Sequence, residues 1–358
     1  MVVIIRDTQL DFRDLLIAPG DSQLSSRKEV SLEMTLPNPH CKSAPTAIPI
    51  FNSNMGPFSF DFVEQMMLNG CIGVLHKWEK PEDLLEFQKK ASILKIDNPL
   101  YNNLFFTIGM AKEDIDIVKQ LLNSSHTLFS QNATINLRID SPNGHNQQFL
   151  DAIKRCRDTF GSDVYIAAGN LVTGEKTEQA IKAGADIVLV GIGGGQQCST
   201  RVQSGVGRPQ ASAVEECARV ARSMKSGIIS DGGIQNPGDM AKAFCLGAHA
   251  VMIGTMLGGA KETNEPIINT SGGAQKRFYG SASQCAHDKF TPKADMSYKS
   301  YEGITTTVPY TGPLANTLDD IKGGLRSTGT FIGAKKLKDF HRKAILYKVN
   351  QQITRRGK

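Results

Sequence analysis

The chain has 358 residues, 40% of them hydrophobic, so it can bury a large core as one α/β barrel or as two smaller domains. Its net charge of +6 is modest, and aromatic residues do not alternate with Lys and Arg, which argues against a nucleic-acid-binding protein. No apolar run is long enough to span a membrane, and Arg6 and Asp7 interrupt the N-terminus too early for a secretory signal. We therefore expect a cytoplasmic protein without membrane or nucleic-acid partners. Seven scattered cysteines without a C-x-x-C pair argue against a disulfide framework and a structural zinc site.

Short apolar segments rich in Ile, Val and Phe recur along the chain and predict eight β-strands. These segments span 48–54, 71–76, 104–109, 134–140, 164–170, 186–193, 227–233 and 250–255. Segments with apolar residues three and four positions apart lie between most of them and predict helices, among them 81–94, 112–123, 145–160 and 174–185. Strands that are apolar throughout belong to parallel sheets covered by helices, and eight βα units favour a closed barrel. We therefore predict an α/β fold, a TIM (β/α)₈ barrel forming a single domain over residues 1–358.

The barrel also predicts where the chemistry lies, because the active site of this fold is at the carboxyl ends of the strands. Polar and glycine residues occur there in this sequence: Asn54, His76, Asp140, Asn170, the loop 193–198, Asp231, Gly254 and Thr255. Residues 261–325, rich in Gly, Ser and Thr, are expected to form a flap over the barrel mouth after the last strand. We find no inserted regulatory module.

Residues 191–200, GIGGGQQCST, follow an apolar strand directly. Glycine lets the chain turn sharply and lets a ligand approach the main chain without meeting a Cβ atom. A flexible turn with a buried thiol would contain the same residues, because cysteine is often only a small apolar core residue. The loop alone therefore leaves both interpretations open.

Longer segments resemble the inosine monophosphate dehydrogenase and guanosine monophosphate reductase superfamily. They are VGIGGGQQCSTRVQSGVGRPQASAV, GIISDGGIQNPGDMAKAFCLGAHAVMIGTMLGGAKE, KRFYGSAS and GGLRSTGTFIGAKKL, and they occur in the order of the family. The resemblance begins near residue 11 and runs to the C-terminal helix. It implies a TIM barrel that binds a purine nucleoside monophosphate, usually as a homotetramer.

The resemblance assigns the nucleophile that attacks C2 of the purine to Cys198. Sulfur suits this role because it is both a strong nucleophile and a workable leaving group. In the family, carbonyl groups of residues matching Gly193, Gly195 and Cys198 also hold a monovalent cation. Potassium dependence is thus implied, and Arg201 completes the expected set of cation ligands.

Asp231, in SDGG, can accept hydrogen bonds from two ribose hydroxyls, while the N–H groups of Gly232 and Gly233 face a phosphate. A turn-forming Asp-Gly is the plain alternative. However, Gly254 and Thr255 follow at the position from which family members hold the same phosphate. The resemblance adds further substrate-binding residues: Tyr279 at the phosphate, Ser281 and Ser283 at the purine edge, and Lys299, Gly303 and Asn54.

The flap distinguishes the two activities of the family. Residues 285–310 lack the Arg-Tyr pair with which the dehydrogenase activates water, whereas Tyr298, Lys299, Glu302 and Gly303 match the reductase pattern. A reductase must protonate the 2-amino group so that ammonia can leave, and a carboxylic acid acting through a hydroxyl can do so. We therefore expect the catalytic residues to be Cys198, Thr200 and Glu302.

The expected reaction is the NADPH-dependent reductive deamination of GMP to IMP and ammonia through a covalent adduct with Cys198. Asp140 matches the family aspartate near the nicotinamide ribose, although capping of the following loop explains it nearly as well. Arg326, with Ser327, is expected to bind the cofactor phosphate, across a subunit boundary.

Some positions depart from the family pattern. Gly194, Gly195 and Gln196 stand where the family usually has Pro-Gly-Ser, Gln197 adds bulk beside the thiol, and Gly56 replaces an acidic residue. These changes leave two alternatives open. One is an oxidoreductase of the same fold that acts in the dehydrogenase direction or on a modified purine nucleotide, and the other is a catalytically silent nucleotide-binding barrel.

Overall fold

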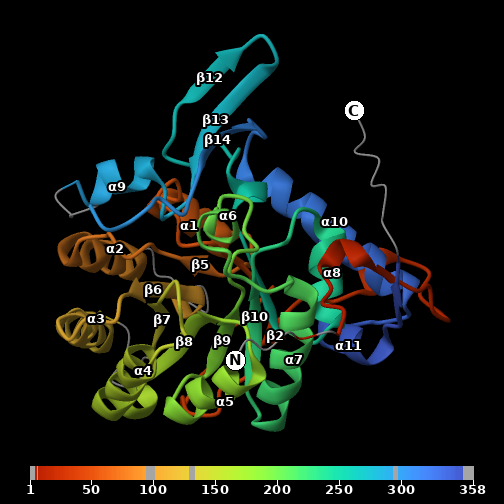
Figure 1. Ribbon diagram of the computed structural model, residues 1–358, viewed down its shortest axis with the longest axis horizontal. Coiled ribbons are helices and arrows are strands. Elements are labelled where there is room, and N and C mark those ends of the chain that lie inside the picture. The colour runs from red at the N-terminus through yellow and green to blue at the C-terminus, as the bar shows by residue number, and fades with distance from the viewer. Residues whose placement is uncertain (1–4, 6, 94–100, 129–133, 293–296, 350–358) are drawn as a thin grey trace.

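The computed structural model describes residues 5, 7–93, 101–128, 134–292 and 297–349. Its centre is a parallel sheet of eight strands in the order β4-β11-β10-β9-β8-β7-β6-β5. A parallel bridge between Phe51 and Ile72 joins the two edge strands, so the sheet closes into a barrel (Figure 1). The predicted (β/α)₈ fold is confirmed. The strands are β4 (Ile50–Asn52), β5 (Gly73–Val74), β6 (Leu104–Ile108), β7 (Ile135–Asp140), β8 (Val164–Leu171), β9 (Ile187–Val190), β10 (Gly227–Asp231) and β11 (Ala250–Ile253).

Helices surround the barrel, and several begin at a side chain that satisfies a free backbone N–H group. Ser59, Asn146, Thr173 and Asn236 each accept such a hydrogen bond at the start of a barrel helix. The barrel helices are α1 (Phe60–Leu68), α2 (Pro81–Ile93), α3 (Asp114–Leu128), α4 (Gln147–Phe160), α5 (Gly174–Ala183), α7 (Gln210–Ser223), α8 (Pro237–Cys245) and α10 (Leu314–Phe331). None of the helices in the described ranges is long and apolar enough to cross a membrane.

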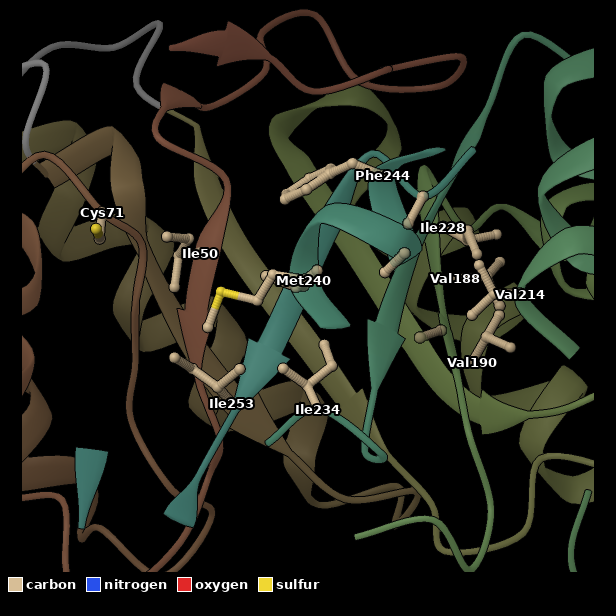
Figure 2. Close-up of a cluster of buried hydrophobic side chains, with 14 of the residues drawn as sticks. Ile50, Cys71, Val188, Val190, Val214, Ile228, Ile234, Met240, Phe244 and Ile253 are labelled. Atoms are coloured by element: carbon tan, nitrogen blue, oxygen red, sulfur yellow. The ribbon is translucent and has the colours of Figure 1, made fainter. Parts of the chain in front are cut away.

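Alternation along each strand divides the core into two layers. Ile135, Leu137 and Ile139 of β7 belong to the outer layer, between the strands and the helices. Figure 2 shows part of this layer, where Val188 and Val190 lie beside the α7 residue Val214. The inner layer fills the interior of the barrel beneath the carboxyl ends of its strands. Its large side chains include Phe51, Phe105, Tyr165, Leu189, Ile229 and Met252. The intervening residues of β7 therefore face the barrel interior.

The flap is a three-stranded antiparallel sheet, which stands above the barrel together with a short helix (Figure 1). Its elements are β12 (Ile267–Thr270), β13 (Gly273–Tyr279), α9 (Gln284–Phe290) and β14 (Thr305–Pro309). The flap leaves and re-enters the barrel at one place. There Lys261 N–H donates to the Gly312 carbonyl and Thr311 N–H to the Gly259 carbonyl, each at 2.8 Å. From Leu314 on, the chain is again a barrel helix, α10, so the end of the expected 261–325 segment packs on α8 and α1.

Small sheets complete the amino-terminal face and one side of the barrel. β2 (Met34–Thr35) pairs with β3 (Thr46–Ala47), and β1 (Leu15–Ile17) pairs antiparallel with β15 (Leu346–Lys348). The second pairing fixes the end of the described chain, after α11 (Phe340–Lys343), against its beginning.

The amino-terminal face of the barrel predicts a pH dependence of stability through His249, which directly precedes β11. Burial, reinforced by the nearby Arg222 and His341, lowers the pKa of His249 from 6.5 to about 4. As the pH falls from about 6.5 to 4, the unfolded chain takes up a proton that the folded protein does not bind. The free energy of unfolding should therefore fall by up to about 3 kcal/mol from this group alone.

Urea unfolding between pH 7 and pH 4.5 measures this contribution. The His249→Gln variant should lose less stability on acidification than the unmodified protein. Parallel pH profiles for the two proteins would contradict the assignment to His249.

Candidate functional site

A cavity of about 340 Å³ lies at the carboxyl ends of the barrel strands, within the usual size range for small-molecule sites. The flap forms part of its wall. Most of the residues expected from the sequence line this cavity: Asn54, Asp140, Gly193, Gly195, Cys198, Thr200, Asp231, Gly232, Gly233, Gly254, Thr255, Ser281, Glu302 and Gly303.

Cys198, Thr200 and Glu302 form a continuous hydrogen-bonded chain. The Cys198 Sγ donates to Thr200 Oγ1 at 3.2 Å, and Thr200 Oγ1 donates to Glu302 Oε2 at 2.7 Å. Thr200 is the first residue of α6 (Thr200–Ser204), and the preceding loop turns sharply through Gly193, whose φ is +77°. A side chain there would be strained, which explains a glycine at this position. The arrangement can move a proton between a thiol and a carboxylate through a hydroxyl.

Backbone pairing fixes the flap against the cysteine loop. Ser199 N–H donates to the Glu302 carbonyl at 2.8 Å, and Ile304 N–H donates to the Gln197 carbonyl at 3.0 Å. The buried amide of Gln197 also donates to the hydroxyl of Thr306 in β14 at 3.1 Å. Gln197, which departs from the family pattern, thus joins the loop to the flap sheet.

Asp231, at the end of β10, presents one free carboxylate oxygen to the cavity. Asn170 Nδ2 donates to Asp231 Oδ2 at 2.8 Å, whereas Oδ1 has no partner in the described part of the chain. Burial raises the pKa of Asp231 above its ordinary value, although Arg138 and Asn170 oppose this effect. The Gln210 amide, which donates to the Asp231 carbonyl and to Val190 O, holds the backbone of this strand end.

Asp140, at the end of β7, lies between two cations. Arg138 Nη1 donates to Asp140 Oδ1 at 2.7 Å, and Lys77 Nζ donates to Oδ2 at 3.1 Å. Burial opposes ionisation, but Arg138 and Lys77 together hold the pKa of Asp140 below its ordinary value. Both oxygens of this carboxylate are therefore engaged, and the group is anionic at neutral pH.

Two glycine turns form the side of the cavity expected to take a phosphate. Gly232 and Gly233 have φ values of +92° and +76°, a conformation that favours glycine. Gly233 N–H donates to the Gly194 carbonyl at 2.9 Å and is therefore already used within the protein. Gly254 precedes a 3₁₀ turn that begins at Thr255, so backbone N–H groups at the start of this turn remain available for an anion.

The backbone carbonyl groups near Cys198 are suitable ligands for a monovalent cation. Those of Gly193 and Cys198 accept no hydrogen bond from the described residues. The Gly195 carbonyl accepts one from Cys198 N–H, and the Arg201 carbonyl accepts one from Gly205 N–H. A carbonyl oxygen has two lone pairs, so this set fits a cation that prefers neutral oxygen ligands.

Several expected residues do not line the cavity. Tyr279 is fully buried, and its hydroxyl accepts a hydrogen bond from Lys289 at 3.2 Å. Ser283 caps α9, and Lys299 is exposed, with its ammonium 5.0 Å from the centre of the Tyr298 ring. The Arg201 side chain points to Asp11, with Nη1 3.8 Å from Asp11 Oδ2. The two residues expected at the cofactor phosphate, Arg326 and Ser327, lie on the outer helix α10.

The sequence interpretation missed Lys77, Arg138 and Gln210, and it gave Asn170 a place at a strand end but no partner. Arg138 could have been noticed, because it lies two residues before Asp140 and so faces the same side of the strand. No sequence signal marks Gln210 as a buried amide that contacts two strand ends.

The structure also accounts for the glycine at position 56. A Cβ atom there would lie 2.5 Å from the ring of Phe290, at the end of α9. The Phe290 ring in turn stacks on Trp78, with centroids 4.5 Å apart and planes 4° from parallel. Gly56 thus provides the space in which the flap helix packs on the barrel rim.

The chain matches the family described as the IMP dehydrogenase / GMP reductase domain over residues 9–357. It is 37% identical to the GMP reductase of Photobacterium profundum over 98% of this chain and 97% of that protein. It is 38% identical to GMP reductase 2 of Bos taurus and to GMP reductase 2 of Homo sapiens, with the same coverage. Together with the barrel and the position of its cavity, these similarities show that the chain belongs to the IMP dehydrogenase / GMP reductase family.

Proposed function

We propose that this protein catalyses the NADPH-dependent reductive deamination of GMP to IMP and ammonia. The observation that carries the proposal is the chain of hydrogen bonds from Cys198 through Thr200 to Glu302. A protein that only binds a nucleotide needs none of these three groups. The relatives named GMP reductase, which align over nearly the whole chain, support the same direction of reaction.

The substrate is bound by groups from several strand ends. Asp231 accepts hydrogen bonds from the ribose hydroxyls through its free Oδ1. The turns at Gly232 and at Gly254–Thr255 hold the phosphate, and Asn54 and Ser281 lie near the base. Three of the expected residues do not line the cavity: Tyr279, Ser283 and Lys299. They can contact the bound nucleotide only after a movement of the flap.

The first half of the reaction replaces the 2-amino group by sulfur. As Cys198 Sγ bonds to C2, Thr200 passes the thiol proton to Glu302. The same acid returns a proton to the 2-amino nitrogen, the C2–N bond breaks, and ammonia leaves. One proton thus moves from sulfur to the leaving group, and the charges balance within the site.

The second half needs a hydride at C2, which reduced nicotinamide supplies when it is bound. The residues for this half are Lys77 and Asp140, because they line the same cavity as Cys198. When C2 has been reduced, the C2–S bond breaks and Cys198 leaves as a thiolate, a role for which sulfur is well suited. Arg326 and Ser327, which lie away from this cavity, would serve the cofactor phosphate across a subunit boundary of a homotetramer.

A potassium ion would be held by the carbonyl groups of Gly193, Gly195, Cys198 and Arg201, and it would stabilise the loop that carries the thiol. We propose a cytoplasmic location, since a reactive thiol and six other cysteines persist best where thiols stay reduced.

Replacing the nucleophile tests the covalent mechanism. Cys198→Ala should abolish NADPH oxidation in the presence of GMP, because the proposed bond between sulfur and C2 cannot form without the thiol. Binding of GMP should survive, since its ribose and phosphate are held elsewhere. Cys285→Ala, a change at another partly buried cysteine, is the control and should retain turnover. Steady turnover by Cys198→Ala would exclude the covalent mechanism.

Replacing the acid separates deamination from hydride transfer. Glu302→Gln should slow the forward reaction from GMP by about 10²–10⁴-fold, the usual contribution of a positioned general acid. Starting from IMP and NADP⁺ without ammonia, the first hydride step needs no proton for an amine. A single-turnover burst of NADPH should therefore persist in the variant. Equal losses in both directions would assign Glu302 to structure or cofactor binding instead.

The ribose contact can be tested by Asp231→Asn, which keeps the shape of the side chain and removes its charge. The dissociation constant for GMP, measured by calorimetry, should rise about 10- to 100-fold, because a hydrogen bond to a charged group contributes about 1.5–3 kcal/mol. Asp163→Asn, at the opposite end of the barrel, is the control. An unchanged dissociation constant in Asp231→Asn would mean that the ribose lies elsewhere.

A further inference from the structure

Arg138 is a charged residue inside the barrel, with only 3% of its surface exposed. It points inward from β7, and the residues directly opposite it on the neighbouring strands are Thr107 and Ala167. Both are small, so the long side chain has room to rise through the top of the barrel. It reaches the floor of the cavity that holds Cys198.

The guanidinium of Arg138 is only partly satisfied. Its Nη1 donates to Asp140, whereas its Nε is enclosed without a partner. Its Nη2 has no acceptor in the described part of the chain and keeps access to the cavity. Burying a cation with unused donors is costly, and buried polar groups in folded proteins nearly always have partners. A bound ligand would supply the missing acceptor.

Besides Asp140, the carboxylate of Asp231 also lies close to Arg138. Arg138 is close enough to lower the pKa of Asp231, yet the two side chains, both within the described ranges, form no ion pair. Asp231 Oδ1 also lacks a partner among the described residues. The floor of the cavity therefore holds an unused acceptor and an unused donor, separated by more than the length of a direct contact.

A hydroxyl group of a ligand complements both, because it donates one hydrogen bond and accepts another. We propose that Arg138 is a specificity-determining residue, which donates a hydrogen bond to a ribose hydroxyl of the substrate while that hydroxyl donates to Asp231. The proposal rests on the proposed function. It explains why Asp140 cannot replace Asp231 here, since Lys77 and Arg138 already occupy both of its oxygens.

The test compares GMP with 2′-deoxy-GMP and 3′-deoxy-GMP in calorimetric binding experiments. The unmodified protein should bind GMP at least about 10- to 100-fold more tightly than one of the two analogues, as expected for a charge-assisted hydrogen bond. Arg138→Met should weaken the binding of GMP by a similar factor and that of this analogue only slightly. The ratio of the two dissociation constants should therefore fall at least about tenfold.

Two further variants separate this role from a general structural one. Arg138→Lys keeps the positive charge, so the ratio of the two dissociation constants should lie between that of the unmodified protein and that of Arg138→Met. Arg157→Met breaks another buried pair, Arg157–Asp186 at 2.6 Å, at the opposite end of the barrel. It should lower the melting temperature and leave the ratio unchanged. If Arg138→Met does not fold, Arg138→Gln replaces it in the experiment. The ratio of the two dissociation constants should then fall at least a few-fold.

An equal loss for GMP and for both analogues would overturn the proposal, as would an unchanged ratio in the Met or Gln variant. Weaker binding of NADPH with an unchanged GMP ratio would assign Arg138 to the cofactor and overturn it as well. Because binding alone is measured, the result is independent of turnover. Binding of GMP without NADPH oxidation would contradict the proposed function and leave the role of Arg138 intact.

Discussion

The candidate site depends on two backbone hydrogen bonds that join the cysteine loop to the flap. They connect Ser199 with Glu302 and Gln197 with Ile304, across about a hundred residues of chain. Without them, only side-chain hydrogen bonds, those of Thr200 with Glu302 and of Gln197 with Thr306, would join the cysteine loop to the flap. A side-chain hydrogen bond contributes only about 0.5–1.5 kcal/mol to stability. The backbone pairing therefore holds the flap at the edge of the cavity. It also keeps the side chains of Cys198, Thr200 and Glu302 next to one another.

Four side chains of alternating charge lie beneath the flap at the top of the barrel: Lys77, Asp140, Arg138 and Asp231. Asp140 bonds to both Lys77 and Arg138, and Asp231 bonds to Asn170. Each charge limits the cost of burying the next, which is why charged side chains can replace apolar ones in the top layer of the barrel. The lower layers are filled by Phe105, Tyr165 and other large side chains. The barrel thus has a rigid apolar base and a polar floor at its catalytic end.

The apolar strand pattern was sufficient to predict the barrel, because every one of the eight segments overlaps an observed strand. Strand lengths were less predictable: the segment 186–193 ends as a strand at Val190, since Gly191 and Gly193 turn the chain away. The link from Cys198 through Thr200 to Glu302 was expected from family resemblance alone, because no periodicity relates a loop to a flap so far along the chain. Arg138 was missed because the strand segments were interpreted as apolar throughout, so no charged side chain was expected to face the interior of the barrel.

The flap enters and leaves the barrel through adjacent backbone groups, those of Gly259, Lys261, Thr311 and Gly312. A segment whose two ends meet can be lengthened, shortened or exchanged without moving the strands beneath it. The thiol of Cys198 belongs to the barrel, whereas Glu302, to which it is linked through Thr200, belongs to the exchangeable part. Divergence among barrels of this kind can therefore proceed by replacing the flap while the nucleophile stays in place. In the proposed mechanism, the step that follows formation of the sulfur bond then depends on a segment that adds no strand to the barrel.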